Sequence, residues 1–83
     1  MNMFVVAVYD RALGAFSSPA FVPSIGVAKR SFGDEVNNDK SPMNAHPEHY
    51  ELHHLGTFDD VSGTFGPKPA DTLLDQASQL IRG

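Results

Sequence analysis

The chain has no cysteine and no tryptophan among its 83 residues, and few of its residues carry a positive charge. The absence of cysteine excludes a disulfide scaffold, thiolate chemistry and zinc sites built on cysteine. Six lysines and arginines stand against ten aspartates and glutamates, so the formal charge is −4. This balance opposes non-specific attraction to nucleic acid unless the basic side chains gather on one face.

Long hydrophobic runs are also missing. No segment reaches the roughly 20 apolar residues of a membrane-spanning helix. Residues 1–8 have neither the basic lead nor the apolar content of a signal peptide. We therefore expect no membrane association and a cytoplasmic location. A chain this short buries only about 60–65% of its unfolded surface, so a second subunit would help it, and a homodimer is expected.

Residues 46–65 have the clearest pattern in the chain, that of a β-hairpin. Alternate residues along the first strand are expected to share one face: Tyr50, Leu52, His54, Gly56 and Phe58. Asp59 then supplies a carboxylate that can accept hydrogen bonds from backbone amides ahead of it. Gly63 supplies the positive φ at which such a turn meets the return strand.

The same turn pattern occurs near the start of the chain. Residues 9–16 (YDRALGAF) match residues 58–65 (FDDVSGTF) as aromatic, Asp, three residues, Gly, small residue and Phe. Each copy follows a strand pattern and precedes a connection marked by prolines. The chain can therefore be divided into two ββα half-repeats, 3–37 and 48–83, joined by the loop 37–47. The alternative is that any two hairpins with five-residue turns look alike.

Two segments have helical periodicity. The first begins at Pro23 and has an apolar stripe of Ile25, Ala28, Phe32 and Val36. Its glycines weaken it by roughly 1 kcal/mol each, and Gly33 could equally end it early. The second begins at Pro69, with a stripe of Leu73, Leu74, Ala77, Leu80 and Ile81. The polar loop 37–47 shows no period and is a candidate functional or mobile segment.

These elements define the expected fold. Residues 3–9 are almost all apolar, as in a central strand covered on both faces, whereas Pro19 confines the segment around it to a sheet edge. The predicted class is α+β: a small antiparallel sheet from two β-hairpins with two helices packed on one face, in the order ββαββα. Residues 1–83 are expected to form a single domain.

Four histidines lie close together in the sequence, at His46, His49, His53 and His54. This density is typical of a metal site, because neutral imidazoles are common zinc ligands. On a strand, however, His53 and His54 point to opposite faces, so only one of them can join the others. The alternative is that all four are turn or exposed sheet residues. We assign no metal and no cofactor from the sequence.

Catalytic signatures are absent from the sequence. The pair Asp59 and Asp60 could hold a divalent cation, but a metal nuclease generally needs further carboxylates from elsewhere. Aspartate in a hairpin turn is the ordinary explanation, and the same residue at Asp10 favours it. No serine triad, phosphate-binding loop or dinucleotide motif is present, so we predict a protein that is not an enzyme and has no catalytic residues.

For nucleic-acid binding the sequence offers basic side chains and aromatic rings. The predicted DNA contacts are Lys29 and Arg30 on the first helix, with Arg11 in the first turn and Lys40 in the loop as outer partners. Candidate stacking surfaces are Tyr9, Phe16, Phe21, Tyr50, Phe58 and Phe65. The alternative is that the aromatics are core and the helix cations form a solvated face.

Several of these motifs resemble a known viral family. They are the run 8–10 (VYD), residues 28–32 (AKRSF) followed by Val36 and Asn37, and above all residues 46–52 (HPEHYEL) leading into 55–60 (LGTFDD). Together they are similar to the small non-structural protein of gokushoviruses, which are tailless single-stranded-DNA bacteriophages of the Microviridae.

The resemblance extends over residues 3–80 and is most specific over 46–63. The family motif has an acidic residue where this chain has His49, so the resemblance gives that histidine no special weight. It implies a non-structural DNA-binding protein of the host bacterial cytoplasm that turns double-stranded replication toward single-strand synthesis and packaging. It supplies no catalytic residues.

Two functions follow as expectations. The first is a non-enzymatic protein that binds single-stranded DNA and assists the switch from genome replication to packaging. The second is a dimeric protein-interaction module that binds a viral replication or capsid protein without binding DNA directly, which the acidic charge suits better. Salt-sensitive binding to a single-stranded oligonucleotide separates the two.

Overall fold

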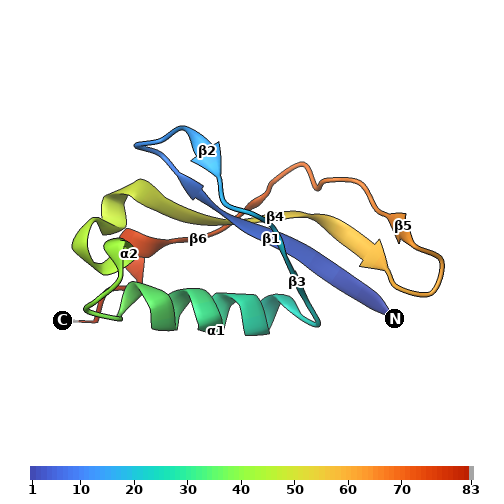
Figure 1. Ribbon diagram of the computed structural model, residues 1–83, viewed down its shortest axis with the longest axis horizontal. Coiled ribbons are helices and arrows are strands. Elements are labelled where there is room, and N and C mark those ends of the chain that lie inside the picture. The colour runs from blue at the N-terminus through green and yellow to red at the C-terminus, as the bar shows by residue number, and fades with distance from the viewer. Residues whose placement is uncertain (83) are drawn as a thin grey trace.

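A computed structural model describes residues 1–82, which form a six-stranded antiparallel sheet and two helices (Figure 1). This confirms the predicted α+β class with a small antiparallel sheet. In chain order the elements are β1 (Asn2–Asp10), β2 (Ala15–Phe16), β3 (Ala20–Val22), α1 (Ile25–Val36), α2 (Pro42–Ala45), the 3₁₀ turn η1 (Pro47–His49), β4 (Tyr50–Asp59), β5 (Thr64–Phe65), β6 (Leu73–Gln76) and the 3₁₀ turn η2 (Ala77–Gln79).

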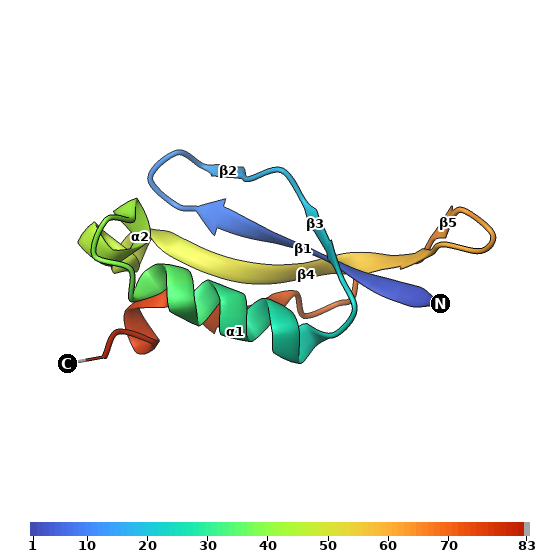
Figure 2. The ribbon, with the colours of Figure 1, turned by 60° about the horizontal axis from the view of Figure 1, so that its bottom comes forward.

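Two long strands, β1 and β4, form the middle of the sheet (Figure 2). They run antiparallel, with Asn2 opposite Asp59 at one end and Asp10 opposite Tyr50 at the other. The short strands β2 and β3 both pair with β1, and β5 and β6 both pair with β4. The apolar N-terminal segment is therefore a central strand, as predicted. Pro19 lies in the gap between β2 and β3, at the sheet edge.

A β-bulge interrupts the central pair. Val5 lies opposite Gly56 while the next residue, Val6, lies opposite His54, so Leu55 is the extra residue. An extra residue exchanges the faces of the strand on either side of it. The single face predicted from alternation is therefore wrong beyond the bulge. Tyr50, Leu52 and His54 share one face, and Gly56 and Phe58 lie on the other.

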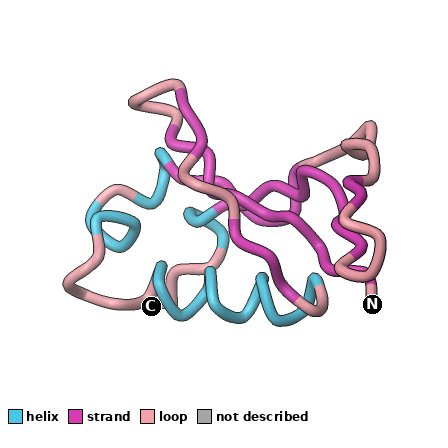
Figure 3. The backbone as a smooth tube through the Cα atoms, turned by 45° about the vertical axis from the view of Figure 1, so that its right-hand side comes forward, coloured by secondary structure: helices cyan, strands magenta, loops and turns pink. Residues whose placement is uncertain are grey.

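One face of the sheet is covered by α1, which runs along it as the lower layer in Figure 1 and the helical turns in Figure 3. Val6 and Leu52 from the central strands meet the apolar stripe of α1 and the fully buried Ala77 of η2; the buried cluster is Val6, Ala28, Phe32, Val36, Leu52 and Ala77. The stripe predicted for this helix is thus its packing face.

Both ends of α1 have a local cause. The Oγ of Ser24 accepts a hydrogen bond from the Val27 N–H at 3.2 Å, which caps the first turn. At the other end the amide of Asn37 donates to the carbonyl oxygens of Gly33 and Leu80, at 2.8 and 3.0 Å. The helix continues past Gly33, so this glycine does not end it early. No helix in the described residues is long and apolar enough to cross a membrane.

The helix predicted from Pro69 is wrong. Leu73–Gln76 pair with β4 as β6, and Ala77–Gln79 form a single 3₁₀ turn. The reason is tertiary: residues 51–54 of β4 have an open edge, and the His54 N–H donates to the Thr72 carbonyl at 2.8 Å. The backbone hydrogen bonds gained by pairing with that edge outweigh the helical preference that the spacing of the leucines indicated.

The second helix lies instead in the loop 37–47, where no periodicity predicted one. Ser41 is buried, and its Oγ accepts a hydrogen bond from the Met43 N–H at 3.1 Å. Pro42 occupies the first helical position, where its missing N–H costs nothing. Met43 packs against the core cluster, so this short helix closes the same face of the sheet that α1 covers.

Candidate nucleic-acid interface

The two hairpin turns have the same atomic structure. In the first, Oδ1 of Asp10 accepts hydrogen bonds from the N–H groups of Ala12 and Leu13, at 3.0 and 3.3 Å. Gly14 follows at φ 72° and donates its N–H to the Asp10 carbonyl. The first predicted turn is thus confirmed.

The second turn repeats these contacts residue for residue. Oδ1 of Asp59 accepts from Val61 and Ser62, at 2.9 and 3.5 Å, and Gly63 has φ 73°. The Val61 N–H, with the other amide and hydroxyl of the turn, holds the pKa of Asp59 below its usual value. The carboxylates therefore serve the turns, as the hairpin explanation predicted. A duplication of two half-repeats stays a prediction.

The sheet face opposite α1 carries most of the aromatic rings. At one end of it, Tyr9 lies directly across from Phe16, with ring centroids 4.8 Å apart. The His53 ring stands edge-on to both, at 6.1 Å from Tyr9 and 5.4 Å from Phe16. These three rings come from β1, β2 and β4, and the sheet register alone puts them on the same side.

A second group of rings occupies the other end of this face. Phe58 lies across from Phe65 at 4.9 Å, because the bulge has moved Phe58 to this side. Phe21 from β3 stands edge-on to Phe58 at 5.3 Å and lies 6.1 Å from Phe65. We call the two groups together the aromatic face: Tyr9, Phe16, Phe21, His53, Phe58 and Phe65.

The aromatic face is in part open to solvent. Phe16 is 44% exposed, Phe21 43% and Phe65 67%, unusually high values for large apolar side chains. The segment 66–72 links β5 to β6, which both pair with β4. Its first residue approaches Gly56 closely, since a Cβ there would lie 2.9 Å from the Gly66 carbonyl oxygen.

One acidic residue lies within the aromatic face. His53 is fixed by two contacts, Nδ1 to the Thr72 hydroxyl at 2.8 Å and Nε2 to a Glu51 carboxylate oxygen at 3.2 Å. Glu51 is only 18% exposed. The pair holds the imidazole against Tyr9 and Phe16 and puts a negative charge on the same face, which a phosphate must avoid.

The four basic residues predicted to bind DNA lie on three separate elements. Lys29 belongs to α1, on the far side of the sheet from the aromatic face, and its Nζ lies 3.9 Å from an Asp75 carboxylate oxygen. Arg30 is exposed on the same helix, and Lys40 is exposed in the following loop. Arg11 is in the first hairpin turn, two residues after Tyr9, and its backbone N–H donates to the His49 carbonyl at 2.7 Å.

The structure thus separates the predicted cations from most of the predicted stacking rings. Of the six candidate aromatics, only Tyr50 belongs to the helix-covered face, where it packs against the core. Part of the aromatic face could be found from the sequence, since alternation along β1 puts Tyr9 and Val5 on the face that does not carry Val6. The bulge that adds Phe58 has no comparable signal. A further basic residue, Lys68, is exposed on the segment 66–72 that links β5 to β6.

The histidines also separate. His53 belongs to the aromatic face, whereas His54 lies 5.5 Å from Phe4 and its Nε2 contacts the Gly56 carbonyl at 2.9 Å. The prediction that these neighbours point to opposite faces is confirmed. His46 and His49 lie together at the start of β4, away from both.

These features define a small α+β protein whose sheet has one helix-covered face and one aromatic face. A family model described as Phage ORF5 protein matches residues 3–80, and the chain belongs to this family of phage proteins. No curated protein and no solved structure matches it. The expected phage protein is confirmed; the narrower assignment to gokushoviruses stays a prediction.

Proposed function

We propose that this phage protein binds single-stranded DNA through the aromatic face and assists the switch from genome replication to single-strand synthesis and packaging in the host cytoplasm. The observation that carries the proposal is the gathering of five predicted stacking residues on one uncovered sheet face. Exposed rings on a sheet accept unpaired bases of any sequence, because every base has a π-face. The activity needs no catalytic residue.

The charge distribution favours single strands over duplex. Six dispersed basic residues and a formal charge of −4 neutralise few phosphates of a double helix. Stacking contributes about 1–3 kcal/mol per base, in addition to any phosphate contacts. Arg11 and Lys68 lie two and three residues after Tyr9 and Phe65, respectively. They are the cations that we expect to contact the phosphates of a stacked strand.

The test replaces rings by branched aliphatic side chains of similar hydrophobicity. The double variant Phe16→Leu and Phe65→Leu should weaken binding of a labelled oligonucleotide by roughly tenfold or more, since each lost stack is worth about 1–3 kcal/mol. Fluorescence anisotropy at two salt concentrations measures it. Val61→Ala, an exposed apolar change in the second turn, is the control and should bind as the parent does. Parental affinity of the double variant would show that the rings are not the platform.

The predicted helix contacts can be tested in the same assay. If Lys29 and Arg30 meet phosphates, changing both to Ala should weaken binding and flatten the salt dependence by about 1–2 units of slope per protomer. Neither residue belongs to the packing face of α1, so circular dichroism should stay unchanged. An unaltered slope would leave the aromatic face, with Arg11, as the binding surface.

A second candidate function is the dimeric interaction module. Each hairpin turn exposes an apolar side chain that is not buried within the monomer: Leu13 is 77% exposed and Val61 84%. Under this alternative the protein recognises a viral replication or capsid protein. Absence of any oligonucleotide binding at low salt, together with loss of partner binding in Leu13→Ser, would favour it over DNA binding.

A further inference from the structure

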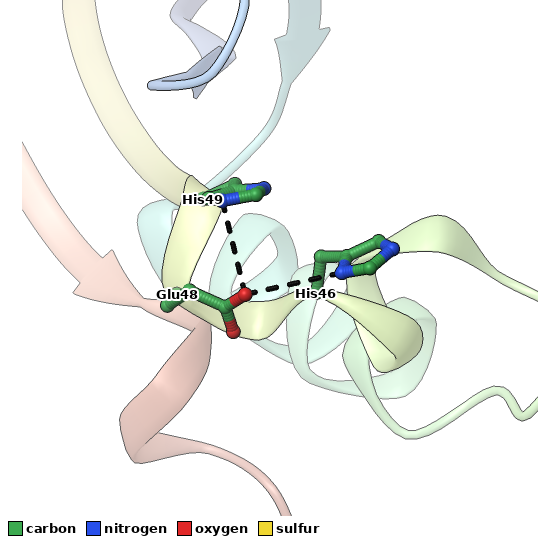
Figure 4. A group of neighbouring side chains, drawn as sticks. All are labelled: His46, Glu48 and His49. Carbon is green, nitrogen blue, oxygen red and sulfur yellow. Dashed lines mark ion pairs between the residues drawn. The ribbon is translucent and has the colours of Figure 1, made fainter.

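The segment that leads into β4 brings three metal-binding side chains together. His46, Glu48 and His49 each direct one ligand atom into a common space, and these atoms all lie within 4.8 Å of one another (Figure 4). One carboxylate oxygen of Glu48 lies 3.9 Å from Nδ1 of His46 and 3.8 Å from Nε2 of His49. The two imidazole rings are nearly parallel, with centroids 5.6 Å apart.

The backbone of this group is held in place by other parts of the fold. The His46 N–H donates to the Pro42 carbonyl at 2.9 Å, and the His49 N–H donates to the His46 carbonyl at 3.1 Å. The His49 carbonyl in turn accepts the Arg11 N–H. The 3₁₀ turn η1 thus fixes the backbone positions of the three residues before any ligand arrives, which lowers the entropic cost of binding.

The distances fit a small transition metal. Zinc bonds imidazole nitrogen and carboxylate oxygen at about 2.0–2.2 Å in tetrahedral geometry, so the ligand atoms of such a site lie about 3.3 Å apart. The two separations from Glu48 therefore need to shorten by about half an ångström, and that between the two imidazole nitrogens, which is at most 4.8 Å, by up to about 1.5 Å, through side-chain rotation. These side chains can rotate in this way, because those of His46 and Glu48 are 63% and 62% exposed.

We propose that His46, Glu48 and His49 form a binding site for a divalent transition metal such as Zn²⁺, with water in the fourth position. Two imidazoles and one carboxylate favour zinc over Mg²⁺, which prefers oxygen ligands. No metal was assigned from the sequence because His53 and His54 point to opposite faces of the strand. The site uses only the two histidines that precede the strand, and Glu48 supplies the third ligand.

One neighbouring charge opposes the metal. Arg11 lines the hollow beside Glu48 and His49. Its guanidinium weakens cation binding through repulsion, and Glu48 offsets this by contributing one negative charge to the site. The site should therefore bind zinc at moderate strength, and Arg11→Ala should bind it more tightly than the parent.

The experiment uses calorimetric titration of the full chain with zinc chloride and, separately, magnesium chloride. One zinc per chain and no measurable magnesium binding is the expected result. Glu48→Gln should lower zinc affinity at least tenfold. Its control is Glu35→Gln on α1, which also removes one negative charge from an exposed glutamate but leaves all three ligands in place, and should bind as the parent does.

Two histidine variants separate this site from the histidines of β4. His46→Asn should weaken zinc binding, whereas His53→Gln, which changes the histidine paired with Glu51, should not. Circular dichroism confirms that each variant is folded. The proposal is overturned by the absence of zinc binding, by equal losses in Glu48→Gln and Glu35→Gln, or by a loss in His53→Gln with none in His46→Asn.

Discussion

At the scale of single residues, the two turn aspartates show how much chemistry a local motif can determine. The spacing of Asp and Gly predicted the turn, and the structure has the same side-chain bonds in both copies, at Asp10 and at Asp59. All the groups involved lie within five residues of each other. This is why the sequence alone was sufficient: no distant part of the fold takes part.

The lowered pKa of Asp59 makes the second turn sensitive to acid. The ionised carboxylate of Asp59 accepts hydrogen bonds from backbone N–H groups and so stabilises the folded state. This stabilisation is complete above the pKa of the unfolded chain, about 3.9, and is lost as pH falls through the lowered pKa of the folded state. The amide resonances of Val61 and Ser62 in NMR spectra should shift with a midpoint below 3.9. In Asp59→Asn, which keeps an acceptor oxygen but does not ionise, this shift should vanish. A parental midpoint at or above 3.9 would contradict the assignment.

Residue-scale reasoning fails at Leu55. Strict alternation predicted that five residues of β4 share a face, but one extra residue moves Gly56 and Phe58 across the sheet. The bulge lies where another segment packs closely: the chain after β5 passes so near Gly56 that a Cβ would meet the Gly66 carbonyl oxygen. Phe58 and its partner Phe65 reach the aromatic face only because of this bulge, so the positions of these two rings could not be predicted from local pattern.

At the scale of elements, α1 was predictable and the C-terminal segment was not. Four apolar residues at helix spacing predicted α1, and the structure adds Ser24 as its N-terminal cap. Residues 73–81 have an equally good helical stripe but lie beside an unpaired edge of β4, and pairing prevails. The outcome there depends on a surface that only the folded sheet provides.

The glycine of α1 offers a matched pair of substitutions. Gly33→Ala should raise the free energy of unfolding by about 0.5–1 kcal/mol, because Ala is the better helix former and a Cβ there meets no atom within 4 Å. Gly63→Ala also has open space but stands at φ 73°, so it should lower the free energy of unfolding by about 1–2 kcal/mol. Urea denaturation measures both. Equal signs for the two variants would refute the explanation.

At the scale of the whole molecule, shape and exposure bear on assembly. The molecule measures 42 × 23 × 19 Å, and the hairpin turns lie toward opposite ends of its long central strands (Figure 1). Phe65 and Val61 expose apolar surface near one end, and Leu13 does so near the other. An elongated domain with a small core gains from burying such surface against a second copy.

We therefore keep the prediction of a homodimer. Multi-angle light scattering after size exclusion should give twice the chain mass at micromolar concentration. Leu13→Ser and Val61→Ser together should shift the equilibrium toward monomer while circular dichroism is unchanged, because the two side chains are 77% and 84% exposed. A parent that stays monomeric at high micromolar concentration would exclude the dimer.

The register of the central strand pair also sets how fast the chain reaches this structure. Each hairpin turn closes between neighbouring residues, an event of microseconds. Pairing Asp10 with Tyr50 and Asn2 with Asp59 instead requires segments roughly 40 or more residues apart to meet. The chain loses the entropy of this loop closure before the strand pairing can stabilise it. We expect the transition state to contain β1 against β4. Substitutions in that pair should then slow folding, and substitutions in the turns should mainly speed unfolding.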